Sequence, residues 1–126
     1  MRSLPLLLLG LLALVLSGCV VAGITALGAG IVYVSGEARQ SYAATVDQTH
    51  QAVLTAMDEM GLIKLEETHQ GADWRIRTRR PTDAADVKIR IRRGGESLTE
   101  VSVRVGLWGD KEYSTQLLEA VGKNLP

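Results

Sequence analysis

Apolar residues are distributed very differently in the first and the later parts of the chain. Residues 4–34 contain no charged side chain. A helix of roughly 20 apolar residues can cross the hydrocarbon core of a bilayer, so this run is long enough for a membrane span. From Gly36 onward apolar and polar positions alternate in regular patterns, which indicates one globular domain behind an apolar N-terminal segment.

Two segments of the later part repeat apolar residues with helical periodicity. Thr45 and Gln48 have the form of a capping box and predict a helix that runs to about Met60 and is ended by Gly61. Asp110 is placed to cap a second helix over 111–123. The core-facing residues are Val46, Val53, Leu54, Ala56, Met57 and Met60 in the first helix, and Ser114, Leu117, Leu118, Val121 and Leu125 in or just after the second.

Shorter segments have the patterning of strands. They are 37–44, 62–68, 74–79, 87–92 and 98–107, and the turn signals HQGAD, PTDAAD and GGES separate the later ones. Short connections favour antiparallel neighbours. The order β-α-β-β-β-β-α therefore predicts an α+β two-layer domain, with an antiparallel sheet of four to five strands and both helices on one face.

The last three predicted strands sort their side chains into two sets that point to opposite faces. One set consists of Trp74, Ile76, Thr78, Val87, Ile89, Ile91, Val101, Val103 and Val105. The other set contains seven cations, namely Arg75, Arg77, Arg79, Lys88, Arg90, Arg92 and Arg104. If the hairpins pair in sequence order, like charges oppose one another across the sheet, which is destabilising.

This basic face has two interpretations. Its side chains can extend into water, interleaved with Glu66, Glu67 and Glu100 from flanking strands. Alternatively, the face docks an anion such as the lipid phosphates of its own membrane, an anionic glycan or an acidic protein surface. Six of the seven cations are arginine, which suits bidentate contacts to phosphate or carboxylate. Nucleic acid is not expected, because no aromatic residues are interleaved for base stacking.

The N-terminal segment has the order of regions typical of a secretory signal. Arg2 precedes the apolar stretch 4–16, and LSGC at 16–19 resembles the lipobox of bacterial lipoproteins. An uncleaved signal anchor is the alternative. Because Val20 is not aspartate, we expect the outer membrane as the destination if the source has two membranes. The predicted organisation is a signal peptide over 1–18, a tether over 19–36 lipidated at Cys19, and a globular domain over 37–126.

The tether contains a stripe of small residues. As a helix, residues 20–34 would be about 22 Å long, which is too short to cross a bilayer. Ala22, Ala26 and Gly30 would lie on one side of it and permit close helix approach. The stripe predicts self-association or docking to another membrane protein, whereas a plain tether that lies on the bilayer is the simpler interpretation.

No pattern in the chain indicates catalysis or a cofactor. Cys19 is the single cysteine and is assigned to lipidation, and no recognised catalytic motif occurs. His50 and His69 lack the spacing of metal ligands, so we expect a helix-flank residue and an exposed turn residue, with no metal. Trp74 and Trp108 are expected to pack in the core and at a strand end rather than to form a ligand cage.

Several stretches carry a resemblance that spans nearly the whole chain. They are the lipobox, YVSGE at 33–37, the pair Gly61-Leu62, and VRVGLWGDKEYS at 103–114, whose RVGxxGDxxxS pattern is the most specific part. Together they resemble an uncharacterised family of small bacterial lipoproteins. The resemblance implies an envelope location, a domain of unknown function and a lipidated Cys19. Relatives tend to have an aromatic residue at the position of His50, which favours a packing role there.

These observations predict a lipid-anchored, non-enzymatic envelope protein that binds or organises an envelope partner through its basic face. The alternative is a structural module at the membrane surface that oligomerises through the small-residue stripe. An enzyme of unrecognised class ranks third.

Overall fold

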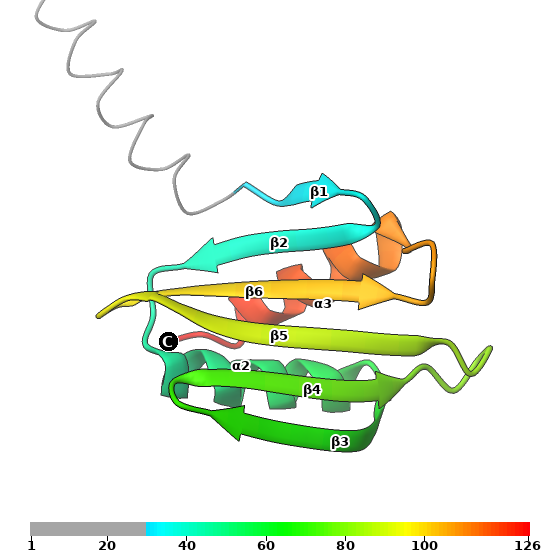
Figure 1. The fold of residues 1–126 in the computed structure, drawn as a ribbon, viewed down its shortest axis with the longest axis horizontal. Helices are drawn as coiled ribbons and strands as arrows, with labels where there is room; N and C mark the ends of the chain where they lie inside the picture. The colour runs from blue at the N-terminus through cyan, green and yellow to red at the C-terminus, as the bar shows by residue number, and fades with distance from the viewer. Residues whose placement is uncertain (1–29) are drawn as a thin grey trace, which may run out of the picture. The chain divides into compact units, whose positions relative to one another are not determined.

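The domain is an antiparallel sheet covered on one face by two helices (Figure 1). The computed structural model describes residues 30–126. The predicted signal peptide, Cys19, Ala22 and Ala26 lie outside these residues. The elements follow in the order β1 (Val32–Val34), β2 (Glu37–Tyr42), α2 (Val46–Glu59), β3 (Ile63–Gln70), β4 (Asp73–Arg79), β5 (Asp86–Gly95), β6 (Leu98–Val105) and α3 (Lys111–Lys123).

The sheet has six strands in the spatial order β1-β2-β6-β5-β4-β3. Every neighbouring pair is antiparallel. The predicted α+β class and the placement of both helices on one face are confirmed, and the strand count is higher than the four to five expected.

The additional strand is β1, in a segment that the sequence pattern assigned to the tether. Val32–Val34 pairs with β2, and Ser35 and Gly36 form the connection with positive φ angles of 54° and 83°. Two adjacent residues with positive φ are typical of a tight hairpin turn. The folded unit therefore begins at Ile31 and includes residues expected in the tether.

Local capping chemistry sets the start of each helix. The Thr45 side chain accepts a hydrogen bond from the backbone N–H of Gln48, and the Gln48 side chain accepts one from the N–H of Thr45, which confirms the capping box. Gly61, at φ +69°, follows the end of α2. Asp110 accepts a hydrogen bond from the N–H of Tyr113 over 3.1 Å and caps α3 as expected.

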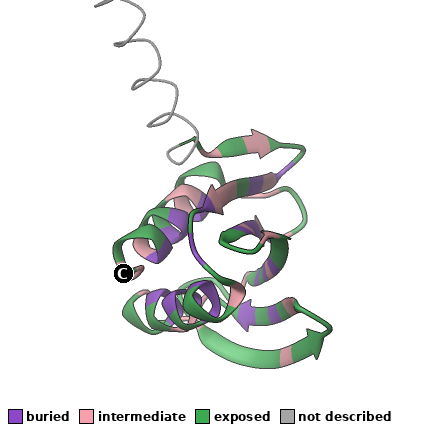
Figure 2. Ribbon diagram, turned by 90° about the vertical axis from the view of Figure 1, so that its left-hand side faces the viewer, coloured by how far each residue is buried: buried purple, intermediate pink, exposed green. Residues whose placement is uncertain are grey.

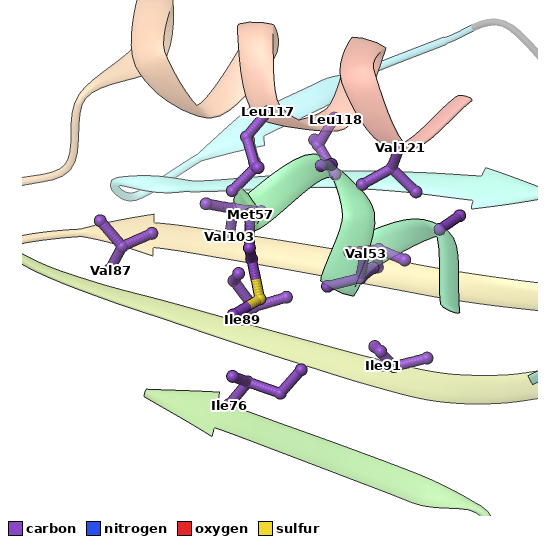
Figure 3. Packing of buried hydrophobic residues seen from close by; sticks show 14 of the residues in the cluster. Val53, Met57, Ile76, Val87, Ile89, Ile91, Val103, Leu117, Leu118 and Val121 are labelled. Atoms are coloured by element: carbon purple, nitrogen blue, oxygen red, sulfur yellow. The ribbon is translucent and has the colours of Figure 1, made fainter. Parts of the chain in front are cut away.

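The core lies between the helices and the sheet (Figures 2 and 3). Side chains of β4, β5 and β6 meet the apolar faces of both helices there. Each buried aliphatic side chain contributes about 1.5–3 kcal/mol relative to an exposed one. Among the fully or almost fully buried residues are Val53, Met57, Ile76, Val87, Ile89, Ile91, Val101, Val103, Leu117, Leu118 and Val121.

The edge strand β3 carries an irregularity that changes which side chains face the helices. Its register with β4 shifts between Lys64 and Glu66. As a result Glu66 is opposite Arg77 on the open face, and Glu67 is opposite Ile76 on the helix side. The expectation that Glu67 interleaves with the basic face is therefore wrong.

Within residues 30–126, neither helix is long and apolar enough to cross a membrane.

Candidate anion-binding face

The face of the sheet opposite the helices gathers the predicted cations. The strand register places Arg75 opposite Arg90, and Arg77 opposite Lys88. Lys88 is in turn opposite Arg104 on β6. The predicted juxtaposition of like charges is therefore present in the structure. Like charges directly opposite each other on one face destabilise a sheet.

Two of these cations have a hydrogen-bond or ion-pair partner within the described residues. Arg77 forms an ion pair with Glu66 over 3.4 Å. Arg104 donates to the carbonyl oxygen of Ser35 over 3.1 Å and to that of Leu107 over 3.3 Å, so its guanidinium holds two turns together. Arg104 is therefore a structural residue in this arrangement.

The other five cations have no such partner. The side chains of Arg75, Arg79, Lys88, Arg90 and Arg92 form no hydrogen bond or ion pair with any residue of the 30–126 segment. The Arg90 Nε is moreover buried and lacks an acceptor among these residues. A buried donor without an acceptor costs about 1–3 kcal/mol.

A hollow of about 480 Å³ lies on the open face along β3, β4 and β5. Four of the seven predicted cations line it, and the other three do not. Its polar lining side chains are Glu66, Thr68, Gln70, Arg75, Arg77, Lys88 and Arg90. The hollow, defined by these residues, combines guanidinium and ammonium groups with neutral hydroxyl and amide groups and with the carboxylate of Glu66, which is paired with Arg77. This set is suited to binding a carboxylate or phosphate. We call it the basic hollow.

The remaining predicted cations lie elsewhere. Arg79 faces Asp86 in the register with β5, and Arg92 lies toward the other end of β5, opposite Glu100. Arg104 lines a second, smaller depression with Val32, Val34 and residues of β2. Gly30, the one member of the small-residue stripe within the described range, is exposed.

Both histidines contact Trp74 on the helix side of β3 and β4. Both imidazole rings stack on the indole of Trp74, each with 3.8 Å between ring centroids. His50 Nε2 lies 2.5 Å from Glu67 Oε1, and Lys64 Nζ lies 2.9 Å from Glu67 Oε2. The hydrogen bond from Lys64, followed by that from His50, lowers the pKa of Glu67.

This cluster corrects two sequence expectations. His50 is buried rather than only flanking the helix, and His69 lies within β3 rather than in a turn. In the described part of the chain no three His, Cys, Asp or Glu side chains are arranged to hold a metal ion. The arrangement fits aromatic packing with one buried polar contact.

A second cluster joins the β4–β5 loop to the start of α3. Arg80 forms ion pairs with Asp83 over 2.7 Å and with Asp110 over 3.0 Å, and its guanidinium lies over the ring of Tyr113. The Arg80 guanidinium lowers the pKa of Asp83 to about 2. The backbone N–H of Tyr113, followed by Arg80, lowers the pKa of Asp110. Sequence patterning did not indicate this cluster, because its partners lie on separate elements.

Trp108 also departs from its expected place. It is 86 % exposed, and the adjacent Leu107 is 77 % exposed, so neither packs at the end of a strand.

A family model described as "Protein of unknown function (DUF3568)" matches residues 2–124. The chain belongs to this family. The predicted membership of a family of unknown function is therefore confirmed. Since DUF3568 has no assigned activity, membership leaves the role of the basic hollow open. A comparison with curated proteins found no match.

Proposed function

We propose that the protein is a lipid-anchored lipoprotein of the cell envelope that binds an anionic group of an envelope partner in the basic hollow. The role is binding and organisation rather than catalysis. The main support is the opposed pair Arg75 and Arg90, which forms no ion pair within residues 30–126, in a wall that also contains the unpaired Lys88. The destination is the periplasmic side of the outer membrane, if the source has two membranes.

The lipid anchor is supported by the N-terminal sequence. The lipobox at 16–19 would supply Cys19 as an acylated first residue after cleavage. Several acyl chains hold a protein on a membrane where a single chain gives only marginal binding. Replacement of Cys19 by alanine should leave the protein unlipidated, and mass spectrometry with membrane fractionation checks this. An unchanged mass and unchanged membrane association would contradict the anchor.

The basic hollow is supported by the choice and placement of its cations. Arginine offers two parallel N–H donors that match the oxygen atoms of a carboxylate or phosphate. Arg75 and Arg90 stand opposite each other in the register, and both line the hollow. An anion between them would reduce the repulsion between the like charges.

Site-specific crosslinking in native membranes tests the binding role. A photoreactive residue at Thr68, in the wall of the basic hollow, should capture a partner. Arg75→Glu with Arg90→Glu should abolish the adduct. The control Arg92→Glu also reverses the charge of an arginine, but Arg92 lies outside the hollow. This control should preserve the adduct. An adduct that survives the double reversal, or the absence of any adduct with the native cations, would contradict the proposal.

A further inference from the structure

The most exposed large apolar side chains of the described chain lie in the loop between β6 and α3. Leu107 and Trp108 are 77 % and 86 % exposed. Their loop lies at the same end of the sheet as the turn between β1 and β2 (Figure 1). On β1, Val32 and Val34 are 57 % and 63 % exposed. We call these four residues the apolar corner.

The corner is held in a defined shape. Gly109 has φ +83°, and a β-carbon there would lie 2.5 Å from the carbonyl oxygen of Gly36. A β-carbon on Gly36 would lie 2.9 Å from the carbonyl oxygen of Trp108. The two turns therefore touch through their backbones, and Arg104 bonds to a carbonyl oxygen of each. These contacts hold the backbone of the Trp108 loop in place, so the exposed Trp108 side chain lies on a well-defined loop.

We propose that the apolar corner inserts into the interface of the lipid bilayer. The inference rests on the proposed lipid anchor. Residues 20–30, between Cys19 and the folded unit, can extend over at most about 36–40 Å, so β1 stays near the membrane that holds the acyl chains. Tryptophan favours the membrane–water interface, where its indole is part apolar and part polar.

The size of the corner favours a lipid occupant over a protein. A stable protein interface uses about 20–30 residues on each side. The corner has four apolar side chains, and Val32 and Val34 share a depression with the charged Glu37, Arg39 and Arg104, so its apolar area is small for a dimer.

Insertion of the corner would leave the basic hollow accessible. In the strand order, β5 and β4 lie three and four positions from β1. At about 4.8 Å per strand, the hollow is roughly 14–19 Å across the sheet from the edge that meets the membrane. The bilayer interface would thus orient the domain and present the hollow to a partner beyond the headgroups.

Fluorescence quenching in vesicles tests this inference. The full chain, purified from membranes, is reconstituted in phosphatidylcholine and phosphatidylglycerol vesicles, with or without bromine on the acyl chains. Brominated lipid should quench the fluorescence of Trp108, which is the part of the emission that is lost in Trp108→Phe. Trp74→Phe retains Trp108 and should preserve that quenching. Trp74, in the aromatic stack of the domain, should be little affected.

The two proposals fail separately in this experiment. Mass spectrometry of the same sample reports whether Cys19 is acylated. Acylated protein whose Trp108 emission is unaffected by brominated lipid would overturn the insertion and leave the anchor intact. Quenching of Trp108 without acylation would support insertion and overturn the anchor, whereas the absence of both would overturn both.

Discussion

Arg75 on β4 and Arg90 on β5 are directly opposite cross-strand neighbours on the open face of the sheet. Neither side chain has an ion-pair partner among residues 30–126. Opposed like charges lower the stability of a sheet, so this pair costs stability unless a bound anion offsets the repulsion.

Neutralising one member of the pair should stabilise the domain. Arg75→Thr removes the repulsion and keeps a residue that favours strands, so we expect the free energy of unfolding to rise by up to about 1 kcal/mol at low salt. Urea denaturation measures it, and the gain should shrink as salt screens the charges. The control Arg92→Thr removes a cation that faces Glu100, and should give no gain. Equal effects of the two variants would contradict this explanation.

The contact between the β1–β2 turn and the loop before α3 requires glycine. Gly109→Ala should destabilise the domain by more than about 2 kcal/mol, because it adds a steric clash with Gly36 to the cost of a positive φ. Gly61→Ala is the matched control, since its φ is also positive but the space around it is open. Its cost should be only about 1–2 kcal/mol. Similar thermal unfolding of both variants would argue against the close contact.

His50 should act through packing. His50→Phe keeps an aromatic ring against Trp74 and should cost less stability than His50→Ala, which leaves a cavity and is expected to cost about 2–4 kcal/mol. Chemical denaturation with and without added zinc distinguishes packing from metal binding. Zinc-dependent stabilisation of the native chain that His50→Phe abolishes would contradict the packing role.

Acid should weaken the cluster around Arg80. The pKa of Asp83 is lowered in the folded state to about 2, so its ion pair stabilises the fold above the unfolded-state pKa of about 3.9. This contribution is lost as the pH falls from about 4 toward 2. Asp83→Asn should therefore lose less stability than the native chain across that window in pH-dependent denaturation. Asp58→Asn removes a carboxylate that forms no ion pair within the described residues, and should follow the native curve.

Features decided by nearby residues could be predicted from the sequence. The caps at Thr45 and Asp110, the end of α2 and the alternation along β4, β5 and β6 depend on spacings of a few positions. The cationic face followed from that alternation. The basic hollow itself required the actual strand register, which selected four of the seven cations and tied Arg104 to two turns.

Other features depend on long-range contacts or on a small irregularity. The register shift after Lys64 moved Glu67 to the helix side, where it meets His50. Arg80 and Asp110 are 30 positions apart in the sequence. Strand β1 consists of three apolar residues that continue an apolar run, so only its pairing with β2 separates it from the tether.

Binding of an anion by Arg90 in the basic hollow can be measured by NMR of the arginine side chains. Inorganic phosphate is titrated into the full chain at low ionic strength while the Nε–Hε signals are followed. We expect a saturable shift of the Arg90 signal, with an affinity that falls about tenfold or more in Arg75→Gln and is unchanged in Arg92→Gln. An Arg90 signal that does not move, or that moves linearly without saturation, would contradict it.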